Sequence, residues 1–142
     1  MRLRTLPTVM MLAALTLSGC RDPTGVGGAT SAAAGIYVLQ PPGENVAYGT
    51  PESGTMRLTR SGNATRDVQY RAGTGMRSYV LKGTFRVEGQ TVALRLIEQT
   101  DGATYEWTPA ATLDGSTLTL RYPGPADGEI IETYHRLSSI VP

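Results

Sequence analysis

The sequence predicts an all-β protein, an antiparallel meander of eight or nine strands that closes or nearly closes into a small barrel. Apolar and polar residues alternate through several segments, which is the period of strands with one buried face. The 17 glycines and 9 prolines supply turns between these short segments. No segment keeps a helical period over three turns. A meander must also protect its two edge strands, and curling until the first strand meets the last removes them.

The first strand is predicted at residues 35–40, where β-branched and aromatic residues precede two prolines that end the strand. Residues 41–54 contain three prolines and three glycines, so they are expected to form the longest loop of the domain. Residues 55–60 alternate cleanly and form the second strand, with its apolar residues on one face.

The turn after this second strand decides how it pairs with residues 65–72. A three-residue loop at residues 61–63, with Asn63 left-handed, sets Met56 opposite Val68, and both then face the apolar side. A two-residue loop would instead oppose an apolar residue to an acidic one. The three-residue loop is therefore predicted.

The clearest alternation lies in residues 78–87. A turn at residues 88–89 pairs Phe85 with Val92, so that the apolar faces of the two strands coincide. Gly83 stands in the middle of this strand, and glycine at such a position marks a bend or a close approach of backbones.

Two further Asp-Gly turns, at residues 101–102 and 114–115, continue the meander, and residues 129–137 form a closing strand. Counting outward from the two turns gives the cross-strand pairs. These pairs are Leu96 with Trp107, Glu98 with Tyr105, and Ala111 with Leu118.

Two hairpins and the last strand resemble those of a known group. Residues 83–94 resemble the G-T-aromatic-x-V-x-G-x-x-aliphatic-x-L hairpin of bacterial lipocalin-like lipoproteins. Residues 111–120 are similar to their A-T-L-x-G-x-T-L-T-L hairpin, and residues 133–137 to their closing Y-x-R strand. The resemblance implies a lipocalin-like barrel over residues 35–137 that binds a small apolar ligand inside, without catalysis.

The start of the chain resembles a bacterial lipoprotein signal. Arg2 and Arg4 precede a short apolar run, as in a secretory signal peptide. Leu17-Ser18-Gly19-Cys20 is similar to the lipobox, in which an aliphatic residue and two small ones precede an obligatory cysteine. The resemblance implies removal of residues 1–19, a diacylglycerol on the Cys20 thiol and acylation of the new amine.

This resemblance also implies the organisation and location of the mature protein. Residues 20–34 comprise the lipidated Cys20 and a flexible tether, and residues 35–142 form the barrel domain. No apolar run after Cys20 could cross a bilayer, so the acyl chains alone would hold the protein to the membrane. In the best-known sorting rule an aspartate after the cysteine signals inner-membrane retention, and Arg21 stands there instead. The resemblance thus implies a cell-envelope protein on the periplasmic face of the outer membrane.

Charge and residue content argue against several function classes. The 13 basic residues nearly balance the 12 acidic ones, and the basic residues are not clustered in the sequence. Nucleic acid is therefore not expected as a partner. His135 and Cys20 are the only residues of their kinds, and neither a metal site nor a cofactor is predicted. No Gly-x-Ser-x-Gly elbow is present, and Glu129 and Glu132 point to opposite faces of a strand. The protein is therefore not expected to be an enzyme.

The predicted pairing also yields one candidate ligand site. Glu98 continues an apolar series of its strand, and the pairing flanks it with Tyr79 and Tyr105, together with Trp107. A carboxylate and aromatic side chains at one end of a barrel interior could orient the polar group of a small ligand. In the alternative interpretation, Glu98 simply lies at the solvated rim of the barrel.

A second function class stays open beside ligand binding. The domain could be a protein-interaction module, for example an envelope assembly factor or a small β-barrel protease inhibitor. It would then act through the 41–54 loop and exposed tyrosines, and its interior would be filled. Ligand binding instead requires an interior that side chains do not fill, and an eight-stranded barrel is only just wide enough for that.

Overall fold

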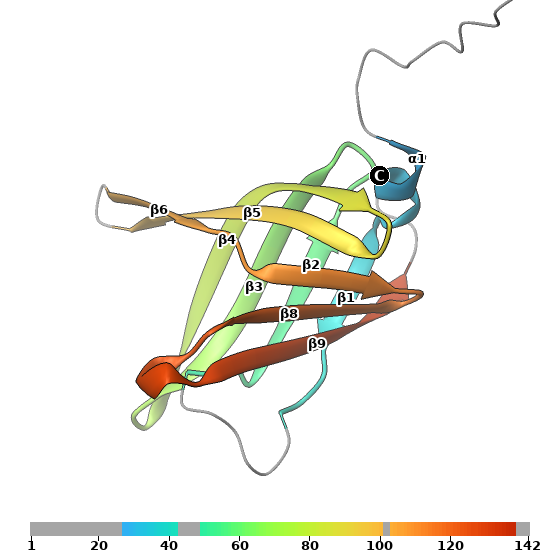
Figure 1. Cartoon of the computed structure of the whole chain (residues 1–142). Helices are drawn as coiled ribbons and strands as arrows, with labels where there is room; N and C mark the ends of the chain where they lie inside the picture. Colours follow the sequence, from blue (N-terminus) through green and yellow to red (C-terminus); the bar gives the residue numbers. More distant parts are fainter. Residues whose placement is uncertain (1–26, 43–48, 101–102, 139–142) are drawn as a thin grey trace, which may run out of the picture.

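The computed structural model describes residues 27–42, 49–100 and 103–138. Eight antiparallel strands close into one barrel, with one additional strand and one short α-helix (Figure 1), which confirms the predicted all-β barrel. No helix in these ranges is both long and apolar enough to span a lipid bilayer. The elements are α1 (Gly28–Ala32), β1 (Gly35–Leu39), β2 (Ser53–Leu58), β3 (Asn63–Ala72), β4 (Gly75–Glu88), β5 (Thr91–Thr100), β6 (Ala103–Trp107), β7 (Ala110–Asp114), β8 (Thr117–Pro123), the 3-10 helix η1 (Pro125–Asp127) and β9 (Glu129–Ser138).

The barrel closes where the first strand meets the last. β1 pairs with β2 on one side and with β9 on the other. β4 pairs with β5, which joins the two halves of the sheet. The order around the wall is β1, β2, β3, β4, β5, β7, β8 and β9.

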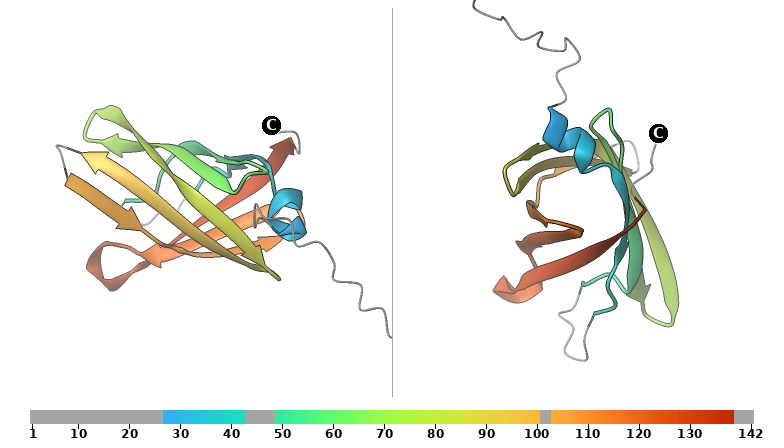
Figure 2. Two further views of the ribbon diagram at one scale, coloured as in Figure 1. Left: turned by 90° about the horizontal axis from the view of Figure 1, so that it is seen from above. Right: turned by 90° about the vertical axis from the view of Figure 1, so that its right-hand side faces the viewer.

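The additional strand β6 belongs to a hairpin that leaves the barrel wall. β5 pairs with β7 through residues 91–93 and with β6 through residues 96–100, so its second half turns away from the barrel. Figures 1 and 2 show this β5–β6 hairpin at the end of the barrel opposite α1. The predicted pairs Leu96 with Trp107 and Glu98 with Tyr105 are confirmed, and residues 101–102 lie outside the described residues.

Two predicted hairpins have the correct faces but a register that is wrong by two residues. The prediction places glycine second in each turn, whereas Gly89 and Gly115 come first, with φ of +66° and +56°. A positive φ at the first of two loop residues is typical of a type II′ turn, which glycine adopts without steric cost. The observed pairs are Phe85 with Leu94 and Ala111 with Leu120.

The loop between β2 and β3 has the predicted length but a shifted position. It spans residues 60–62, and Gly62 rather than Asn63 takes the left-handed conformation, with φ of +82°. Glycine is preferred there because it has no Cβ to clash with the backbone. The partner of Met56 is consequently Arg66, two residues from the predicted one.

One end of the barrel is packed with apolar side chains and covered by α1. Thr30, Ala33 and Ala34 are buried against this end. The backbone N–H of Val87 donates to Oγ1 of Thr30 at 2.9 Å, and the hydroxyl of Tyr37 donates to the carbonyl of Ala33 at 2.7 Å. The fully buried apolar residues of this core are Tyr37, Met56, Leu58, Leu96, Leu118, Leu120 and Tyr134.

The N-terminal helix changes one expectation about domain boundaries. Residues 28–34 were expected to belong to a flexible tether, but they pack on the barrel, because small side chains fit there and Thr30 satisfies a strand N–H. The folded domain therefore begins before residue 35. Residues 20–26 of the predicted tether lie outside the described residues.

Candidate functional site

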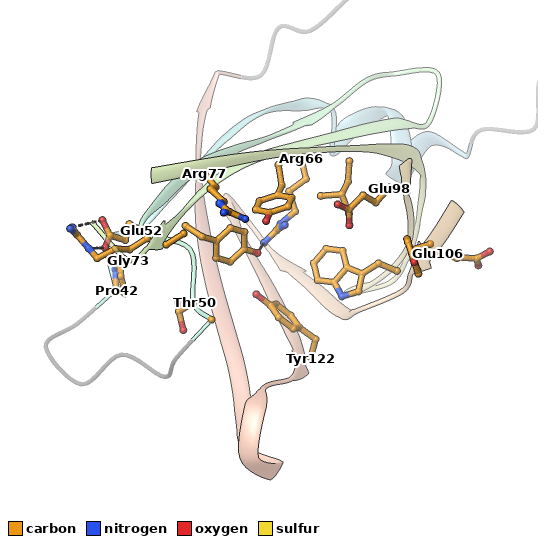
Figure 3. Close-up of a pocket in the computed structure, with 17 residues that line it drawn as sticks. Pro42, Thr50, Glu52, Arg66, Gly73, Arg77, Glu98, Glu106 and Tyr122 are labelled. Carbon is orange, nitrogen blue, oxygen red and sulfur yellow. Dashed lines mark hydrogen bonds and ion pairs between the residues drawn. The ribbon is translucent and has the colours of Figure 1, made fainter. Parts of the chain in front are cut away.

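The end of the barrel opposite α1 contains a cavity of about 1150 Å³ (Figure 3). Its walls come from β3, β4, β5, β6 and β8 and from residues 49–52. Typical small-molecule sites occupy about 300–1,000 Å³, so this space is ample for a ligand of that size. The barrel is therefore filled at one end and hollow at the other.

The structure brings all four predicted ligand-site residues to the wall of this cavity. Tyr79 projects from β4, Glu98 from β5, and Tyr105 and Trp107 from β6. Tyr79 and Tyr105 are 36% and 61% exposed and therefore lie at the mouth. Trp107 and Glu98 are half-buried, and Glu98 points into the cavity (Figure 3).

The floor of the cavity holds a buried ion pair that sequence reasoning missed. Arg66 on β3 and Glu132 on β9 are 2% and 1% exposed. The Arg66 guanidinium binds the carboxylate with two donors, Nε to Oε2 at 3.2 Å and Nη2 to Oε1. Such a two-donor pair satisfies both charges at a site that is almost completely buried.

Two tyrosine hydroxyls complete the surroundings of this carboxylate. Tyr134 donates to Oε2 of Glu132 at 2.5 Å, and Tyr122 donates to Oε1. Burial raises the pKa of Tyr122, and the charge of Glu132 raises it further. Burial likewise raises the pKa of Tyr134, where Arg66 opposes the shift and Glu132 adds to it. Although burial alone would lower the pKa of Arg66, Tyr134 and Glu132 raise it above its ordinary value. At neutral pH both phenols thus remain donors and the guanidinium stays charged.

Aromatic rings surround the Arg66 guanidinium and wall the cavity. Its central carbon lies 4.7 Å from the ring centroid of Trp107 and 6.0 Å from that of Tyr70. Trp107 meets Tyr122 edge to face, with centroids 5.0 Å apart and planes at 83°. Tyr70 meets Tyr79 in the same way, at 5.5 Å and 80°. These contacts hold the rings in fixed positions, and their free faces offer apolar surface to a ligand.

Alternation places Arg66 and Glu132 in the interior, but no local pattern pairs them. Each falls at an inward position between two buried apolar residues of its strand. A charged side chain at such a position indicates a dedicated partner. The partner lies 66 residues away on a strand that is not adjacent in the sheet, so only the closed barrel reveals it.

The remaining candidates from the sequence lie apart from the cavity. His135 is exposed on β9, and its Nδ1 lies 3.2 Å from Oγ1 of Thr117, within hydrogen-bonding distance. Within the described ranges, no three His, Cys, Asp or Glu side chains are grouped so that they could hold a metal ion. Cys20, the predicted lipidation site, lies outside these ranges.

Fold and site together define a class: a small antiparallel barrel, plugged at one end, with an aromatic-lined cavity at the other. Neither a protein-family model nor a curated protein sequence matches this chain.

Proposed function

We propose that this protein is a lipid-anchored, non-enzymatic carrier or sensor that holds a small apolar molecule in the open end of its barrel. The observation that carries the proposal is the cavity of about 1150 Å³ in a barrel whose other end is closely packed. Eight strands leave just enough room for side chains to fill the interior, and here the end opposite α1 is left unfilled. This favours ligand binding over the alternative of a protein-interaction module with a filled interior.

The lining of the cavity supports a ligand that is largely apolar. Tyr70, Tyr79, Trp107 and Tyr122 present rings to the space. Aromatic walls with a few polar groups are typical of small-molecule sites. The polar groups of the floor are bonded to one another, so the floor presents mainly ring faces to a bound molecule.

Native mass spectrometry on the protein, purified gently from its own envelope, tests the proposal. A co-purifying small molecule is expected in the wild type. Leu81→Trp, which adds an indole to the cavity wall, should eliminate this bound mass. The matched control is Val80→Trp, because Val80 is the next residue on β4 and is 51% exposed. A ligand-free mass in the wild type, with no apolar probe bound either, would contradict the proposal.

The membrane anchor is a separate part of the proposal and has its own test. The lipobox-like Leu17-Ser18-Gly19-Cys20 supports acylation of Cys20 and attachment to the outer membrane, facing the periplasm. Cys20→Ser should prevent acylation and release the protein from the membrane fraction, whereas Arg21→Lys should leave it there. Retention of Cys20→Ser in washed membranes would show that another part of the chain provides the attachment.

A further inference from the structure

Three arginines line the cavity, and two of them already have carboxylate partners. Arg66 is bonded to Glu132 at the floor. Arg71 at the rim is bonded to Glu52, with 2.9 Å between Nη2 and Oε2. Across the described residues, Arg77 has neither a carboxylate within ion-pair distance nor a hydrogen-bond partner for its guanidinium.

Arg77 faces the cavity rather than the outer surface of the barrel. It lies on β4 two residues before Tyr79 and four before Leu81, and all three line the cavity. Its cross-strand partner is Tyr70, whose ring packs edge to face against Tyr79. Figure 3 shows Arg77 reaching toward the middle of the space. Its guanidinium therefore lies at the mouth, beside the aromatic wall.

The acidic side chains of the mouth do not engage Arg77. Glu52 is already in an ion pair. Glu106 accepts a hydrogen bond from Nη2 of Arg95 at 2.7 Å and points away from the cavity (Figure 3). Glu98 has an interaction partner of its own. Among the described charged groups of the mouth, Arg77 is the cation whose donors remain available to a ligand.

The interior below Arg77 favours an apolar body. Both oxygens of Glu132 accept hydrogen bonds from protein groups, and Arg66 is held between this carboxylate and the ring of Trp107. Burying a further unpaired charge against these rings would be costly. An amphiphilic ligand would therefore bind with its apolar part inward and its charged end at the mouth.

We propose that the ligand is a small anionic amphiphile, a flat apolar or aromatic body that carries one oxyanion group, bound at the mouth by Arg77. A guanidinium binds a carboxylate, sulfonate or phosphate through paired, charge-assisted hydrogen bonds. The rings of Tyr79 and Trp107 lie where the apolar body would pack. This inference rests on the proposed function and specifies its ligand class.

Two fluorescent probes with one ring system test this inference. The probe 8-anilinonaphthalene-1-sulfonate carries a sulfonate, and N-phenyl-1-naphthylamine lacks it. Each is titrated into the full-length protein in detergent, with energy transfer from Trp107, the only tryptophan, as the readout. A Trp107→Phe variant serves as the blank, because without tryptophan it reports only background.

Arg77→Gln should lower the affinity for the sulfonate probe about tenfold, equivalent to about 1.4 kcal/mol of binding free energy. Its affinity for the neutral probe should change less than about twofold. Arg77→Lys should recover part of the lost affinity because it keeps the charge. Arg57→Gln, an exposed substitution on β2 away from the cavity, is the matched control and should affect neither probe. Equal thermal midpoints of the variants show that they are folded.

Three results would contradict the inference in distinguishable ways. An unchanged affinity of Arg77→Gln for the sulfonate probe would exclude Arg77 as the anion site. Equal losses for both probes would show that Arg77 only shapes the cavity. Either result, with both probes bound to the wild type, would leave the proposed function standing. Failure of both probes to bind the wild type would overturn the proposed function as well.

Discussion

The backbone oxygen of Arg95 occupies the space that a side chain on Gly83 would need: an ideal Cβ on Gly83 would lie 1.9 Å from it. β4 and β5 approach each other at this point because residue 83 has no side chain, as its mid-strand position indicates. Gly83→Ala is therefore expected to lower the free energy of unfolding by more than about 2 kcal/mol, since one backbone must move.

Urea denaturation measures this loss, and the same strand supplies the control. A Cβ on Gly75 would meet nothing nearer than 4.0 Å, so Gly75→Ala should change the free energy of unfolding by less than about 0.5 kcal/mol. Similar losses in the two variants would contradict the close approach of β4 and β5.

The ion pair at the cavity floor should make stability depend on both of its charges. Glu132→Gln leaves the buried guanidinium of Arg66 without a counter-charge. Removing one partner of a buried ion pair lowers the free energy of unfolding by about 3–5 kcal/mol. Glu129→Gln, on the same strand, breaks only a half-exposed pair with Arg121 and should cost less than about 1 kcal/mol. Urea unfolding compares the two variants. Equal, small losses would show that the buried carboxylate does not stabilise the fold.

The phenols of the half-buried Tyr122 and the buried Tyr134 should make the fold sensitive to alkaline pH. Their pKa values are raised in the folded state, so their contribution to stability is fully present below about pH 10, where unfolded tyrosine is also protonated. Above about pH 10 the unfolded chain releases these protons while the folded protein keeps them. The free energy of unfolding should then fall by about 1.4 kcal/mol per pH unit for Tyr134, and by less for the half-buried Tyr122, whose interactions are screened by solvent.

Urea unfolding at a series of pH values from 8 to 11 checks this slope. Tyr122→Phe removes one of the two phenols and should reduce the slope by the share of one tyrosine. Tyr105→Phe is the control, because Tyr105 is 61% exposed. A slope that is the same in wild type and Tyr122→Phe would refute the linkage.

The N-terminal helix should contribute to stability through Thr30. Thr30→Val keeps the shape of the side chain but removes the oxygen that accepts from the N–H of Val87, leaving that donor unsatisfied. A loss of about 1–3 kcal/mol is expected from thermal or urea unfolding. Ser31→Ala is the neighbouring control, because no hydrogen bond of its hydroxyl is formed with the described residues. An unchanged free energy of unfolding in Thr30→Val would mean that the helix does not stabilise the barrel through this hydrogen bond.

The strands and their faces were predictable because alternation is a local property. The hairpin registers were harder, since a shift of two residues keeps every face and changes only which residues are opposite. Gly62, Gly89 and Gly115 decided the outcome through positive φ at specific loop positions. The observed registers follow from glycine at the third position of the loop at residues 60–62 and at the first position of the loops at 89–90 and 115–116.

The candidate site was predictable in part for the same reason. Glu98, Tyr105 and Trp107 share one hairpin, so a single turn places them together. Arg66 and Glu132 could not be paired from sequence, because their contact exists only after the sheet closes. Arg77 lies at an inward position by alternation, but its lack of a partner is a property of the whole mouth.

Arg66 and Glu132 join strands that are not neighbours, since β2 and β1 separate β3 from β9 along the wall. Their bond is therefore a chord across the cross-section of the barrel. This bond fixes the distance between β3 and β9 and so resists widening of the barrel at that depth. Ligands of different width must therefore bind above it. There the wall is interrupted, because the pairing of β4 with β5 ends at Lys82 and Ile97. The barrel is thus rigid at the level of the ion pair and can widen at the mouth of the cavity.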